Sequence, residues 1–126
     1  MKLVTPYLML AVIVWLPWGM LCIFNVQLIE TIIGVTSTSV DGTSDIRAMY
    51  GGAQTGVGLM AAFALYNRTY VTEALFALAF LGTSMAFARS YGLIVDGSWT
   101  FYTSSIAVYE AFTGLSAIIL LKSFKR

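Results

Sequence analysis

The sequence predicts an all-α integral membrane protein, a four-helix bundle that forms one transmembrane domain over residues 1–126. Two observations lead to this prediction. Of the 126 residues, 59% are hydrophobic and only 10% are charged, whereas a soluble domain carries about 25% charged residues to solvate its surface. The chain also contains four mostly apolar stretches of about 20 residues, the length that an α-helix needs to cross a bilayer.

The four predicted spans are separated by connections that contain most of the charged residues. The first span has no ionisable side chain, but Pro17 near its middle predicts a kink. The first connection is rich in Gly, Ser and Thr, and we expect it to be irregular with a short interfacial segment at 28–35. Ser44 or Asp45 then suits the N-cap of the second span. In order, the spans cover residues 7–28, 46–66, 71–90 and 103–121.

The charges predict the orientation of these spans. Four spans would place five basic residues on one side of the membrane: Lys2, Arg68, Lys122, Lys125 and Arg126. The opposite side would receive four acidic residues: Glu30, Asp41, Asp45 and Asp96. Because cytoplasmic loops carry an excess of Lys and Arg, we predict that both termini are cytoplasmic.

The composition also excludes several classes of function. The chain has no histidine, and Cys22 is its only cysteine, which removes the ligands of ordinary zinc sites, haem groups and iron–sulfur clusters. The histidine base and the Cys–His and Ser–His pairs of many enzymes are missing as well. The net charge of +1 offers no basic surface to nucleic acid. We therefore predict no catalytic residue, metal site, cofactor or nucleic-acid partner.

Three ionisable residues are predicted to lie in or at the ends of spans, where a charge at the bilayer centre costs about 2.5–3.5 kcal/mol. Arg47 and Arg89 would lie at the outer ends of the second and third spans, and Glu110 about 10 Å below the outer end of the fourth. Helical spacing places Tyr50 and Gln54 on the same stripe as Arg47. These five residues form the predicted polar patch, which either binds a ligand or is structural.

Several interpretations of the polar patch remain open. In a structural cluster, Glu110 would neutralise one arginine, and Asp45 or Glu30 would neutralise the other. In a binding site, the excess positive charge would receive an anionic headgroup, carboxylate or phosphate. A proton or ion pathway is a further interpretation.

Glycines on the predicted second and fourth spans suggest close helix packing. The spacing from Gly52 to Gly56 is the small-xxx-small pattern that lets membrane helices approach. This stretch does not suit a phosphate-binding loop, since no strand precedes it and no lysine follows it. The predicted helix-packing residues are Gly51, Gly52, Gly56, Gly58 and Gly114.

Two motifs resemble those of a known family. The first runs from Asp45 to Gly52 as Asp-Ile-Arg-Ala-Met-Tyr-Gly-Gly, and the second from Ala88 to Gly97 as Ala-Arg-Ser-Tyr-Gly-Leu-Ile-Val-Asp-Gly, with Glu110 following. Together they resemble the small bacterial membrane proteins catalogued as domain of unknown function 4345, in which glycine is frequent at the position of Ala88. The chain is similar, more distantly, to the four-span DoxX-like proteins. The resemblance implies a four-helix fold in the bacterial inner membrane and no activity.

We therefore expect a non-enzymatic membrane protein, either an accessory subunit or a protein that uses the polar patch to bind lipid or a small hydrophobic anion. The expected partners are membrane lipid and either a membrane protein or a second copy of the chain. The alternative is a small-anion or proton-linked transporter that works as an oligomer. An enzyme acting on a lipid would need Glu110 as its acid or base, and no nucleophile or metal supports it.

Overall fold

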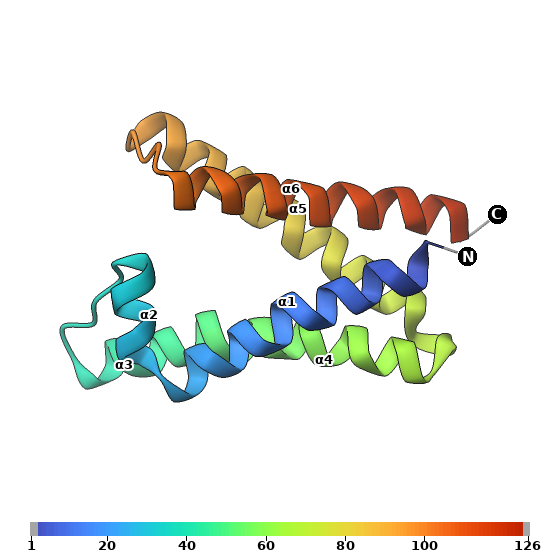
Figure 1. The fold of residues 1–126 in the computed structure, drawn as a ribbon, viewed down its shortest axis with the longest axis horizontal. Coiled ribbons are helices and arrows are strands. Elements are labelled where there is room, and N and C mark those ends of the chain that lie inside the picture. Colours follow the sequence, from blue (N-terminus) through green and yellow to red (C-terminus); the bar gives the residue numbers. More distant parts are fainter. Residues whose placement is uncertain (1–2, 125–126) are drawn as a thin grey trace. The chain divides into compact units, whose positions relative to one another are not determined.

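The computed structural model describes residues 3–124, and these residues form helices and connections with no β-strand (Figure 1). The prediction of an all-α fold is therefore confirmed. The basic residues Lys2, Lys125 and Arg126, on which part of the predicted orientation rests, lie outside the described residues. In chain order the elements are α1 (Val4–Phe24), α2 (Val26–Ile33), α3 (Val40–Ile46), the π-helix η1 (Arg47–Gly52), α4 (Ala53–Tyr66), the 3-10 helix η2 (Arg68–Tyr70), α5 (Val71–Val95) and α6 (Phe101–Phe124).

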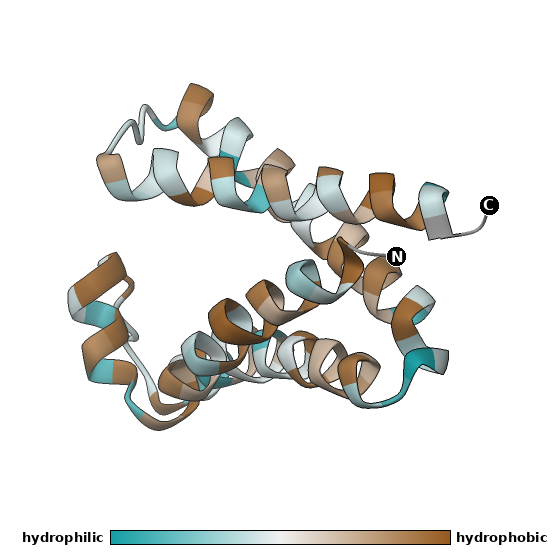
Figure 2. Ribbon diagram, turned by 45° about the vertical axis from the view of Figure 1, so that its right-hand side comes forward, coloured by the Kyte–Doolittle hydropathy of each residue, from teal (hydrophilic) through white to brown (hydrophobic). Residues whose placement is uncertain are grey.

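Within residues 3–124, three helical segments are long and apolar enough to cross a membrane, namely Val4–Phe24, Arg68–Val95 and Phe101–Ser123. Figure 2 shows mostly hydrophobic or intermediate residues along them. Large apolar side chains are exposed on these helices, among them Ile13, Phe87 and Ile119, as expected of helices that face lipid. The segments agree with the first, third and fourth predicted spans and fit a membrane protein.

The predicted second span, residues 46–66, differs from the other three. It contains the six-residue π-helix η1, and the regular α-helix α4 that follows has only 14 residues. The helix also begins earlier than expected, at Val40, with the Ser39 hydroxyl as N-cap accepting from the Gly42 N–H at 3.0 Å. The prediction of Ser44 or Asp45 as N-cap was wrong, because the helix begins further upstream, where the Ser39 hydroxyl satisfies the Gly42 N–H.

The described chain divides into two compact units, one from Thr5 to Arg68 and the other from Thr69 onward together with the N-terminal residues up to Val4. In the first unit, α1 packs antiparallel to the continuous helix made by α3, η1 and α4. The contacts follow the length of both helices: Gly51 lies against Ile23, Gly58 lies against Leu16, and the Arg68 guanidinium donates to the Thr5 hydroxyl at 2.8 Å.

The first unit also contains a structured connection after α1. The predicted first span extended to residue 28, but α1 ends at Phe24 because Asn25 begins a new helix. The Asn25 side chain accepts from the Leu28 N–H at 3.1 Å and thus caps α2. Gly34 ends α2 in the left-handed conformation with φ 72°. The helix α1 continues through Pro17, and a kink there stays a prediction.

The second unit is a hairpin of α5 and α6, which run antiparallel. Its closest approach is between Gly82 and Gly114, where a Cβ added to Gly82 would lie 2.6 Å from the Gly114 nitrogen. The helix α5 continues five residues past the predicted end of the third span, to Val95. Residues 91–95 are Tyr-Gly-Leu-Ile-Val, and the last three are strongly apolar, so the apolar helix extends past the predicted end. Gly97, with φ 65°, lies in the turn to α6.

Candidate functional site

The hairpin of α5 and α6 contains a bidentate ion pair between Arg89 and Glu110. Arg89 Nε donates to Glu110 Oε2 at 2.8 Å, and Arg89 Nη2 donates to Glu110 Oε1 at 2.7 Å. Glu110 is only 1% exposed, while the Arg89 side chain is 27% exposed. A parallel pair of charge-assisted bonds is the strongest geometry that arginine makes with a carboxylate. This is the pairing that the structural interpretation of the polar patch predicts for one arginine.

The close contact between Gly82 of α5 and Gly114 of α6 explains how the two side chains meet. Gly82 lies two turns before Arg89 on α5, and Gly114 lies one turn after Glu110 on α6. Their missing side chains let the two backbones approach closely. Because both oxygens of Glu110 are engaged, the pair stabilises the hairpin and does not present a free carboxylate.

Arg47 has a different environment, in the unit from Thr5 to Arg68. Its side chain is exposed, and its Nη1 donates to the backbone carbonyl of Ile23 in the last turn of α1. The last carbonyl groups of a helix have no partner within the helix, so Arg47 caps the end of α1. Arg47 thus holds the start of η1 against α1.

The predicted ion pair of Arg47 with Asp45 or Glu30 is not found among residues 3–124. Glu30 instead accepts from the Ser37 N–H at 3.2 Å and orders its own connection. Within residues 3–124, the expected pairing with a carboxylate is thus found for Arg89 and not for Arg47.

The remaining residues of the polar patch lie on the same helix as Arg47. Tyr50 lies in η1 and Gln54 in the first turn of α4, and both are half-buried. Arg47, Tyr50 and Gln54 belong to one unit, while Arg89 and Glu110 belong to the other. The convergence of all five residues on one patch stays a prediction.

The predicted packing glycines divide into two groups. Gly51, Gly58 and Gly114 are buried at close helix contacts, each with another segment's backbone within 3 Å of an added Cβ. Gly52 and Gly56 are exposed and make no close contact with another helix, because they lie about 100° around the helix from the contacting stripe. Gly82 shares the small-residue face of Arg89, and its added Cβ would lie 2.6 Å from the Gly114 nitrogen. Gly19 was not predicted as a packing glycine, although its added Cβ would lie 2.5 Å from the Thr55 nitrogen.

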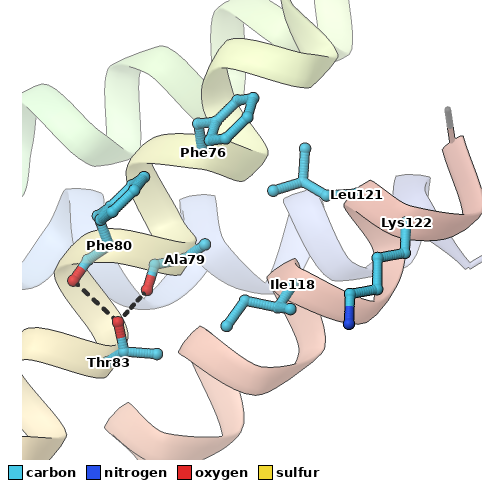
Figure 3. A pocket seen from close by; sticks show the side chains of 7 residues that line it. All are labelled: Phe76, Ala79, Phe80, Thr83, Ile118, Leu121 and Lys122. Atoms are coloured by element: carbon cyan, nitrogen blue, oxygen red, sulfur yellow. Dashed lines mark hydrogen bonds between the residues drawn. The ribbon is translucent and has the colours of Figure 1, made fainter.

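A pocket of about 290 Å³ lies between the first half of α5 and the last turns of α6 (Figure 3). The two phenylalanines on its α5 side, Phe76 and Phe80, are stacked with ring centroids 6.3 Å apart. The Thr83 hydroxyl donates to the Ala79 carbonyl at 2.6 Å, so its hydrogen is used within the helix. The lining consists of Phe76, Ala79, Phe80, Thr83, Ile118, Leu121 and Lys122.

The pocket is almost entirely apolar, and Lys122 is the one charged side chain among its lining residues. This pocket was not predicted from the sequence. The i, i+4 spacing of Phe76 and Phe80 and the lysine at the end of the last span were visible, but such features are common in membrane helices. The apolar walls and the single cation suit a molecule with a hydrocarbon chain and a negative group.

The part of the chain that the structure describes is all-helical and contains three helices long and apolar enough to cross a membrane, which defines the class of the protein. The chain belongs to the family described as "Domain of unknown function (DUF4345)", which matches residues 4–121. This confirms the resemblance drawn from the two motifs. No curated protein and no solved structure gives a significant match to the chain.

Proposed function

We propose that the protein crosses the bacterial inner membrane four times, with both termini in the cytoplasm, and binds a lipid or hydrophobic anion without catalysing a reaction. In addition to the three candidate spans, the proposal needs the predicted second span, residues 46–66, where η1 continues directly into α4. This stretch has the length that a span needs, and a π-helical segment within a membrane helix is often associated with a functional site.

The observation that carries the binding function is the apolar pocket between α5 and α6. The sequence placed the ligand at the polar patch, but Glu110 already occupies Arg89. Arg47 already donates to the Ile23 carbonyl, and the preceding helix α3 carries Asp41 and Asp45, whose negative charges oppose the approach of an anion. The pocket therefore suits the same class of ligand better than the polar patch.

Native mass spectrometry of the full chain, released from a mild detergent, tests this function. We expect the wild-type protein to retain a lipid-sized adduct from the membrane. Phe80→Ala removes one wall of the pocket and should reduce the retained fraction severalfold, because the ligand loses apolar contact area worth about 25 cal/mol per Å².

Phe87→Ala is the matched control, since Phe87 is an exposed phenylalanine on the same helix but does not line the pocket. It should leave the retained fraction unchanged. A protein that carries no adduct, or equal losses in the two variants, would contradict the proposal.

Proton-linked transport is the second candidate, and the burial of Glu110 within a candidate span favours it. Ionisable groups inside a membrane often mark proton pathways. A transporter should lose flux in proteoliposomes when Glu110→Gln is introduced with the fold preserved. Equal proton or anion flux in the wild type, the variant and empty liposomes would remove this candidate.

A further inference from the structure

Lys122 is the charged residue among those that line the apolar pocket. It lies in the last turn of α6, next to Leu121, which is buried at the pocket wall. Among residues 3–124, no carboxylate lies within 4 Å of its ammonium nitrogen. An apolar pocket lined in part by a lysine that has no ion-pair partner among the described residues matches an amphiphile with a negative group next to a hydrocarbon chain.

The pocket is lined by residues from the first half of α5 and the last turns of α6, toward the end of the hairpin where α5 begins and α6 ends. In the proposed orientation this end is cytoplasmic, where anionic lipids give the membrane a negative surface potential. Glu73, one turn before Phe76, is the nearby acidic residue on α5. It makes no ion pair with Lys122 within the described chain, so the lysine charge is available to a ligand.

The volume of the pocket limits what it holds. At about 290 Å³ it is close to the lower end of ordinary ligand pockets, roughly 300–1,000 Å³. It therefore accommodates a segment of one acyl chain and not a whole diacyl lipid. The stacked rings of Phe76 and Phe80 offer this chain a flat apolar wall.

We propose that the pocket is a binding site for one anionic phospholipid of the cytoplasmic leaflet. One acyl chain lies against Phe76 and Phe80, and the phosphate pairs with the Lys122 ammonium group. This inference rests on the proposed binding function and adds the headgroup charge and the leaflet. Lysine at the C-terminus of a helix also complements the helix dipole, and that role alone would affect stability without selecting a lipid.

The test measures the affinity of the full chain in detergent micelles for three probes: dioleoylphosphatidylglycerol, dioleoylphosphatidylcholine and oleate. We expect tighter binding of phosphatidylglycerol than of phosphatidylcholine. Lys122→Met keeps the length of the side chain but removes its charge, and it should weaken phosphatidylglycerol binding about fivefold. The same variant should leave phosphatidylcholine binding unchanged, and Lys122→Arg should restore the preference.

The outcomes separate this inference from the function on which it rests. Absence of binding for all three probes would overturn both. Equal binding of the two phospholipids, or no effect of Lys122→Met on the preference, would overturn the inference and leave an apolar binding pocket. Oleate binding more tightly than phosphatidylglycerol would overturn the assignment to a phospholipid in favour of a free fatty acid.

Discussion

Replacing Gly82 with alanine tests how the α5–α6 hairpin is held together. An added Cβ would lie 2.6 Å from the Gly114 nitrogen, 2.9 Å from the Gly114 Cα and 3.0 Å from the Glu110 carbonyl oxygen. Favourable contacts between such atoms need about 3.5–4.0 Å, so the helices must separate by about 1 Å. Because backbone atoms cannot rotate away, the shift also strains the Arg89–Glu110 bonds of 2.7 and 2.8 Å.

The steric cost can be isolated with a second glycine. Overpacking of this kind costs about 1–3 kcal/mol, while alanine gains about 1 kcal/mol over glycine in a helix. Gly56→Ala is the matched control, because Gly56 is exposed in a helix and nothing lies within 4 Å of its added Cβ. Both variants gain the same helix propensity, so their stabilities should differ by the steric term of about 1–3 kcal/mol.

Unfolding of the protein in mixed micelles with increasing SDS, followed by circular dichroism at 222 nm, measures this difference. Gly82→Ala should unfold at a lower SDS fraction than Gly56→Ala. If the two variants unfold at the same SDS fraction, the close contact of Gly82 with Gly114 does not limit the hairpin.

Two further predictions concern the charged residues. Glu110→Gln should destabilise the protein by about 2–3 kcal/mol. Breaking a fully buried ion pair costs about 3–5 kcal/mol, and the cost is lower here because Arg89 is partly exposed. In the same SDS assay, Arg89→Gln combined with Glu110→Gln should cost less than the sum of the single variants, and an additive result would argue against the pair. Arg47→Ala should remove the cap of α1 at Ile23, so hydrogen exchange should accelerate at the end of α1 and not in α6. Equal exchange in both proteins would show that the cap is unimportant.

The sequence was sufficient to predict the helical class and three candidate spans, because an apolar run of about 20 residues is typical of a membrane-spanning helix. The sequence was less informative where a single polar contact determines where a helix begins or ends. Asn25 divides the predicted first span through one side-chain bond to Leu28, and asparagine also occurs within helices. The π-helix η1 could not be predicted, because no hydrophobic pattern in residues 47–52 distinguishes a π-helix from an α-helix.

For the candidate site, helical spacing correctly directed attention to Arg89 and Glu110, since a buried carboxylate needs a partner. It did not identify the partner of Arg47, which is a backbone carbonyl and is invisible to a search for opposite charges. The choice of Gly52 and Gly56 as packing residues relied on a motif, whereas contact depends on the side of the helix that faces its neighbour. The pocket depends on how side chains of two helices leave space, which no local pattern records.

Photolabelling in native membranes tests the central claim, that the α5–α6 pocket binds a lipid. A phosphatidylglycerol with a diazirine in one acyl chain would be incorporated into membranes that contain the full chain, and the labelled residues would be mapped by mass spectrometry. The account predicts labels concentrated on the pocket residues of 76–83 and 118–122, with a decrease there in Phe80→Ala. Labels spread evenly over the exposed apolar residues, including Phe87 and Ile119, would contradict it.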